Sequence, residues 1–135
     1  INDKAVIGII KVLIHGKLDA KEFISDNLEI DKITNDRLRA LVGTILPIAN
    51  TPSSEIIASL GNEKDRTIIT QIMLEEDSSV DFLHMSVDCI STISKNYARK
   101  KTEEYRQKIR QMESEGKDTA ELMNAILQIQ KDMNA

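Results

Sequence analysis

Apolar residues recur at helical spacing through most of the chain, and the strict alternation typical of strands is nowhere sustained. Between Asp3 and His15 the apolar residues fall on one face of a helix. They are Val6, Ile9, Ile10, Leu13 and Ile14. Gly16 is a natural helix end. The pattern therefore predicts an all-α protein whose first helix ends before Gly16.

Four shorter segments with apolar residues at helical spacing follow. Asp19 with Glu22 resembles a capping box that opens a second helix. A third helix is expected from Thr34 or Asn35, with Pro47 in its last turn. The third helix should bury Leu38, Leu41, Val42, Ile45 and Leu46.

Cap signals also predict the next two helices. Thr51 followed by Pro52 predicts the start of a fourth helix, which Gly61 would end. Asn62 with Asp65 predicts the start of a fifth. Its expected buried residues are Ile68, Ile69, Ile72 and Met73.

A long segment without Gly, Pro or a turn cluster follows, from about Ser79 to Glu115. A continuous helix of that length would be about 54 Å long. Its first half should pack in the bundle through Val80, Leu83, Val87, Ile90, Ile93 and Tyr97. Its second half is mostly charged, so we expect it to project from the bundle.

Gly116 should break the long helix, and Asp118 with Glu121 forms a second capping-box pattern. A break followed by a cap makes Tyr97 to Asn134 a helical hairpin. The sequence thus predicts a compact helical bundle, residues 1–95, followed by a long helix and a C-terminal helical hairpin subdomain, residues 96–135.

The last helix carries two neighbouring apolar stripes. Leu122, Ile126, Ile129 and Met133 can pack on Tyr105, Ile109 and Met112 of the long helix. Met123, Leu127 and Gln130 form the second stripe, which one helix–helix contact cannot cover. We expect the second stripe to bind a partner, and packing against the bundle is the alternative. The predicted partner-binding residues are Tyr105, Ile109, Met112, Leu122, Met123, Ile126, Leu127, Gln130 and Met133.

The middle of the long helix is basic, although the chain carries a net charge of −4. The basic residues are Lys95, Arg99, Lys100, Lys101, Arg106, Lys108 and Arg110. Two interpretations stay open: solvated pairs such as Arg99 with Glu103 and Lys100 with Glu104, or a strip for an anionic partner. Tyr97 and Tyr105 are the only aromatics there, so we rank an acidic protein above nucleic acid.

Residues suited to catalysis are sparse, and we expect no catalytic centre, metal or cofactor in this chain. His15 and His84 lie on different predicted helices, and Cys89 has no basic neighbour in sequence. His84 should be a surface residue near Asp81 or Asp88, and Cys89 a small buried one. The acidic run Glu75, Glu76 and Asp77 lacks calcium-loop spacing and is expected to be a solvated helix end.

No apolar run approaches the about 20 residues that span a membrane. The single cysteine fits a reducing compartment. We therefore expect a cytoplasmic protein, and the start at Ile1 suggests a fragment of a longer chain.

The C-terminal stretch NYARKKTEEYRQKIRQMESEGKDTAELMNAILQIQKDM, residues 96–133, is similar to the end of bacterial DnaG-type DNA primases. NDRLRALVGTIL, residues 35–46, looks like the third-helix segment of the same family. The resemblance covers nearly the whole chain and rests on helix order and on the turn at Gly116–Asp118. It implies a helicase-binding domain that docks primase onto the N-terminal domains of the hexameric DnaB-type replicative helicase for primer synthesis in DNA replication.

That resemblance implies that the hairpin provides most of the contact with the helicase. It also implies that the polymerising centre and the zinc-binding domain lie in other parts of such primases. Three alternatives remain open. The helicase's own N-terminal domain has a similar bundle and hairpin. The chain could instead be a self-associating helical adaptor, or it could bind nucleic acid through the basic strip.

Overall fold

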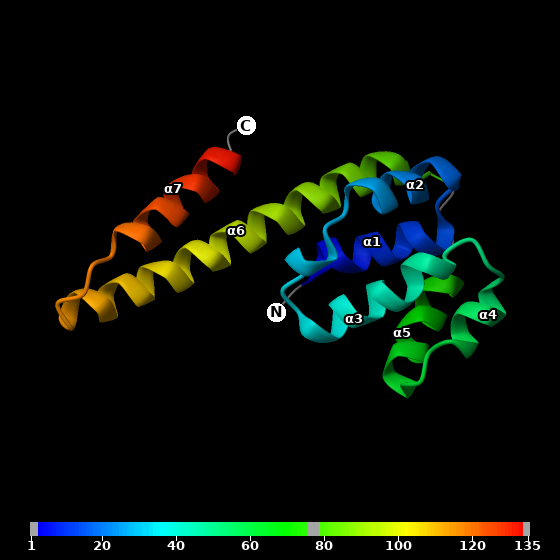
Figure 1. Cartoon of the computed structure of the whole chain (residues 1–135). Helices are drawn as coiled ribbons and strands as arrows, with labels where there is room; N and C mark the ends of the chain where they lie inside the picture. Colours follow the sequence, from blue (N-terminus) through cyan, green and yellow to red (C-terminus); the bar gives the residue numbers. More distant parts are fainter. Residues whose placement is uncertain (1–2, 76–78, 134–135) are drawn as a thin grey trace. The chain divides into compact units, whose positions relative to one another are not determined.

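The computed structural model describes residues 3–75 and 79–133 (Figure 1). These residues form α-helices and two short 3₁₀ turns, with no strand among them, so the all-α prediction is confirmed. The helices are α1 (Lys4–His15), α2 (Leu18–Asn27), α3 (Asp36–Ile45), α4 (Ser53–Ala58), α5 (Glu63–Leu74), α6 (Phe82–Ser114) and α7 (Ala120–Met133). The 3₁₀ turns are η1 (Ile30–Lys32) and η2 (Leu46–Ile48).

The chain divides into two compact units, which we call unit 1 (Ile1–Ile93) and unit 2 (Ser94–Ala135). Helix α6 is continuous through the boundary, so its first residues belong to unit 1 and the remainder to unit 2. Unit 2 therefore consists of the last part of α6, a turn and α7.

Helix α1 lies at the centre of unit 1. It contacts α2, α3 and α5. Ile9, Ile10, Val12 and Leu13 are all 0% exposed, so the helix is buried around most of its circumference. The sequence identified most of this face, except that Val12 is buried and Ile14 only half-buried.

Helix α6 approaches α1 closely at Gly8. A Cβ atom placed on Gly8 would lie 2.5 Å from the Sγ atom of Cys89, closer than packed atoms can come. On the same face of α6, Ser86 is fully buried, and its hydroxyl donates to the Leu83 carbonyl at 2.7 Å. Small residues on both helices therefore allow this contact.

This close contact turns α6 away from the predicted orientation. Leu83 and Val87 are 39% and 43% exposed, so their predicted place in the core is wrong. The residues packed on the core include Phe82, Met85 and Cys89 instead. Ile93 is buried and Ile90 packs on the core, both as predicted. The physical reason is that the face of α6 that fits against Gly8 is the one that carries Cys89, with Met85 beside it.

The predicted Asn62 cap is confirmed, and the predicted Asp19 cap is wrong. The start of α3, left open between Thr34 and Asn35, is capped by Asn35. Asn35 accepts from the Leu38 amide at 3.0 Å, and Asn62 accepts from the Lys64 amide at 2.8 Å. Helix α2 begins before Asp19, whose carboxylate accepts from the Ala20 amide inside the first turn. A carboxylate there still complements the positive helix N-terminus.

Helix α4 differs from the prediction at both ends. Pro52 is its N-cap residue, while the Thr51 hydroxyl donates to the Ile48 carbonyl at 2.7 Å. The helix ends at Ala58, ahead of Gly61, and Leu60 after it is buried. Pro47 lies in η2, which confirms its place in a tightened last turn of the preceding helix.

Unit 2 turns at Gly116, which has φ +71°. The Gly116 amide donates to the Glu113 carbonyl at 3.1 Å, and the Lys117 amide donates to the Met112 carbonyl at 2.9 Å. This pair of bonds is a Schellman motif, in which glycine takes the left-handed position at low cost. The Asp118 carboxylate accepts from the backbone amide of Ala120, the first residue of α7, at 3.0 Å. Asp118 therefore lies one residue before the N-cap position of α7, which Thr119 occupies.

A candidate protein-docking surface on the helical hairpin

One face of α7 is covered. Leu122, Ala125, Ile126 and Ile129 are half-buried, at the i, i+3, i+4, i+7 spacing of a single helix face. On α6, Ile109 is 9% exposed, and the predicted packing residues Tyr105 and Met112 are half-buried. The covered face of the hairpin is therefore the one that the sequence predicted.

Met133 is the exception on that face. It is the last residue of α7 and remains 49% exposed. The prediction that it shares the covered stripe is wrong, because Met133 lies at the end of the described helix, where fewer neighbours surround it than surround Ile126 and Ile129.

A second face of α7 is open. Met123 is 46% exposed and Leu127 is 61% exposed, and Gln130 is exposed beside them. Met123 and Leu127 stand one helical turn apart and so form one apolar ridge. We call Met123, Asn124, Leu127, Gln130 and Lys131, all exposed, the outer face of α7.

The nine residues predicted to bind a partner therefore separate into two groups. Five lie on covered surfaces of the hairpin and shape it: Tyr105, Ile109, Met112, Leu122 and Ile126. Four are exposed enough for direct contact: Met123, Leu127, Gln130 and Met133. Asn124 and Lys131 join the outer face although the sequence argument omitted them. Their spacing of one and eight residues from Met123 could have placed them there.

The hairpin has a small core. In the described part of unit 2, the buried apolar residues are Ala98 and Ile109. A pair of helices with so little buried surface is marginally stable alone. Contact with another protein would add the apolar burial that the hairpin lacks.

The basic segment of α6 forms different ion pairs from those predicted. Glu103 pairs with Arg110 at 3.5 Å, and Glu104 pairs with Lys101 at 3.4 Å, so Arg99 and Lys100 are not their partners. Helical side chains tilt toward the helix N-terminus, so Arg110 can reach back to Glu103. Glu104 raises the pKa of Lys101, whose ammonium group also lies 5.8 Å from the centre of the Tyr97 ring.

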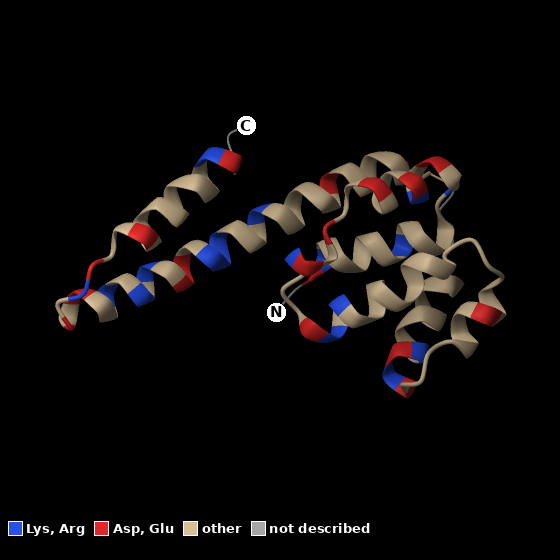
Figure 2. Ribbon diagram, viewed as in Figure 1, with Lys and Arg blue, Asp and Glu red and all other residues tan. Residues whose placement is uncertain are grey.

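The other cations of this segment are unpaired in the described chain. Within residues 3–75 and 79–133, ion pairs involve none of Lys95, Arg99, Lys100, Arg106 and Lys108. In Figure 2, the blue ribbon segments that mark Lys and Arg recur along this part of α6. Unit 2 thus presents free positive charge to solvent.

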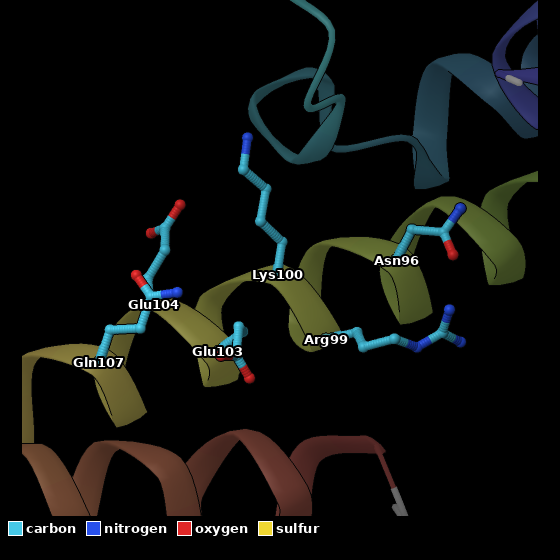
Figure 3. Close-up of a pocket in the computed structure, with 6 residues that line it drawn as sticks. All are labelled: Asn96, Arg99, Lys100, Glu103, Glu104 and Gln107. Carbon is cyan, nitrogen blue, oxygen red and sulfur yellow. The ribbon is translucent and has the colours of Figure 1, made fainter. Parts of the chain in front are cut away.

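A hollow of about 430 Å³ follows one side of the same segment (Figure 3). Its lining residues are Asn96, Arg99, Lys100, Glu103, Glu104 and Gln107. In Figure 3, the Lys100 side chain points away from the helix, whereas that of Arg99 runs alongside it. Two cations and two carboxylates balance each other in this lining. The hollow therefore lacks the single sign of charge that a phosphate-binding site would need.

The two histidines and Cys89 make contacts within the fold. His84 lies on the surface, 73% exposed, with its Nε2 atom 3.2 Å from the Asp88 carboxylate, as predicted. His15 donates to the Ile72 carbonyl, and its ring stacks on that of Phe82. Burial raises the pKa of the Cys89 thiol, and the charge of Asp88 raises it further. A raised pKa leaves little thiolate at neutral pH.

The acidic run after α5 is only partly described. Glu75 pairs with Lys11 at 3.1 Å, while Glu76 and Asp77 lie outside the described residues. Across the residues that the structure does describe, no group of three or more His, Cys, Asp or Glu could hold a metal ion. No described helix combines the length and the apolar character needed to cross a membrane.

Comparison with known proteins identifies no relative. No protein-family model matches the chain, and no curated protein sequence and no solved structure matches it.

Proposed function

We propose that this chain is a protein-docking module that tethers a DnaG-type primase to the N-terminal domains of a hexameric DnaB-type replicative helicase. The exposed apolar ridge of Met123 and Leu127 on the outer face of α7 supports the docking role most directly. The choice of partner rests on the resemblance of residues 96–133 to the end of such primases. The mechanism is binding alone, without bond chemistry or a cofactor in this chain.

Docking would proceed as a helix entering a groove. Met123 and Leu127 are one turn apart, which suits two adjacent pockets between partner helices. Methionine is unbranched and adapts to irregular pockets, while leucine fills a defined one. Burying the exposed part of both side chains would contribute to binding, because apolar surface leaves water.

Two exposed leucines, one in each unit, allow a matched test. Leu127 is 61% exposed on α7, and Leu74 is 77% exposed at the end of α5 in unit 1. Leu127→Ala should weaken binding to the helicase N-terminal domain by about 1–2 kcal/mol, which is roughly 5- to 30-fold in Kd. Leu74→Ala removes the same atoms from a different exposed site and should leave Kd unchanged.

The measurement is calorimetric titration of the whole chain into the N-terminal domain of the same organism's replicative helicase. Circular dichroism confirms that each variant is folded. An equal loss of affinity with both variants would assign the effect to nonspecific hydrophobic contact. Absence of any heat of binding with the folded wild-type chain would refute the helicase assignment itself.

A further inference from the structure

The outer face of α7 contains no carboxylate. Its exposed residues are two apolar side chains, two amides and the cation Lys131. The acidic residues of α7, Glu121 and Asp132, lie on another side of the helix, because each is displaced from Leu127 by more than a quarter turn. The Asp132 carboxylate is also engaged, since it accepts from the Gln128 amide at 2.9 Å.

Lys131 has no counter-charge among the described residues. It is exposed, stands one turn beyond Leu127, and forms no ion pair with any residue in the described ranges. A partner that covers Leu127 will also cover much of the Lys131 stem. Its ammonium group must then meet a carboxylate or lose hydration without compensation.

Unit 2 is the positive part of an acidic chain. It contains nine Lys and Arg and seven Asp and Glu, a balance of +2, whereas the whole chain carries −4. The two carboxylates of the basic segment, Glu103 and Glu104, are already paired with Arg110 and Lys101. The unpaired cations of unit 2 therefore favour the approach of an acidic surface.

A second copy of the chain fits the outer face poorly. Two α7 helices packed antiparallel about Leu127 would place Met123 of one against Lys131 of the other, four residues away on either side. Each contact would cover a charge with an apolar side chain, which is unfavourable. Such symmetric pairing would repeat the mismatch at both ends of the interface.

Nucleic acid and a membrane surface also fit less well. Lys101 lies over the ring of Tyr97, and Tyr105 is half-buried, so neither ring is freely available to stack bases. Membrane binding scales with apolar area, and the outer face offers two apolar side chains, Met123 and Leu127. An acidic protein groove meets both the apolar and the charged requirement.

We propose that the groove receiving α7 has an apolar floor for Met123 and Leu127 and an acidic residue at the end that faces Lys131, with further acidic residues around its rim. This inference rests on the proposed docking function and specifies the chemistry of the partner surface. It predicts that charge reversal at Lys131 acts locally rather than through net charge.

The test is the same calorimetric titration with three variants, repeated from about 50 to 300 mM salt. Lys131→Glu should raise Kd about tenfold or more at low salt, and Lys131→Arg should change it less than about threefold. Lys64→Glu makes the same charge change at an exposed lysine of unit 1. It should change Kd less than about threefold, and the acid it adds suits the first turn of α5. Wild-type binding should weaken with salt, and binding of Lys131→Glu should respond less.

Each other outcome overturns the inference in a distinguishable way. Binding that is lost with Leu127→Ala but unaffected by Lys131→Glu would keep the docking function and exclude the acidic groove. Equal effects of Lys131→Glu and Lys64→Glu would assign the change to net charge. No wild-type binding would remove the proposed function and this inference together. Dimers seen by analytical ultracentrifugation, or binding to vesicles of anionic phospholipid, would identify a different occupant of the outer face of α7 if Leu127→Ala abolished them.

Discussion

The contact between Gly8 of α1 and Cys89 of α6 gives a stability prediction that can be worked from distances. Replacing Gly8 with Ala puts a methyl group 2.5 Å from the Cys89 Sγ atom. Cys89 is half-buried and its Sγ atom is one bond from the Cβ, so the sulfur has little freedom to move. Of the staggered positions open to it, one is rare inside a helix.

Two effects of the substitution oppose each other. Alanine is favoured over glycine within a helix by about 1 kcal/mol. Overpacking a filled core costs about 1–3 kcal/mol, and here the helices would also have to separate. We expect overpacking to win, so Gly8→Ala should lower the free energy of unfolding by about 1–2 kcal/mol.

A double-mutant cycle isolates the clash. Cys89→Ala alone removes a packed sulfur and should destabilise by about 1 kcal/mol. Because Cys89→Ala also removes the atom that the new methyl group meets, the double variant should be more stable than the sum of the two single changes predicts. Urea unfolding followed by circular dichroism at 222 nm provides the four free energies. A Gly8→Ala protein at least as stable as wild type, or strictly additive effects, would refute the close-contact argument.

Two other residues give tests of their own. Gly116→Ala should cost about 1 kcal/mol, because φ +71° is unfavourable for a residue with a Cβ, and Gly116→Asn should cost less; thermal melts followed by circular dichroism compare the two, and equal melting temperatures for wild type and Ala would contradict it. The Cys89 thiol should reach its half-maximal rate of iodoacetamide modification at a higher pH than a free thiol does, because burial and Asp88 both raise its pKa. Unfolding in urea should return the profile to that of a free thiol, and identical folded and unfolded profiles would show that the burial has no such effect.

The sequence predicted the helices best where two independent signals agreed. The α3 start had an apolar face preceded by two residue types that cap helices, Thr34 and Asn35, and Asn35 is the one that caps it. The hairpin turn had a glycine and a following acid, and Gly116 adopts the left-handed conformation. Asp19 had the cap pattern alone, and α2 begins before it, so a two-residue pattern was insufficient.

The orientation of α6 in unit 1 could not be read from its own residues. Hydrophobicity favoured Leu83 and Val87 as core, yet they are exposed. What fixes the orientation is the depth of the surface on α1, where Gly8 leaves space for Cys89. That information is distributed over two helices about eighty residues apart, and single-helix periodicity does not contain it.

The ion pairs of α6 failed prediction for a related reason. Spacing of four residues suggested Arg99 and Lys100 as partners of the two glutamates. Arg110 and Lys101 are the partners instead. Exposed pairs of this kind are worth about 0–1 kcal/mol, so small differences in side-chain reach decide which one forms.

The difference between the two faces of α7 separates folding from docking. Ile126 lies on the covered face, so replacing it should lower the stability of the hairpin together with any binding. Leu127 is its immediate neighbour and 61% exposed, so replacing it removes little buried surface and should cost the fold less than about 1 kcal/mol. Stability and binding measured together on these two neighbours would therefore reveal whether α7 is a docking helix, because folding predicts a parallel loss and docking predicts a loss of binding alone at Leu127.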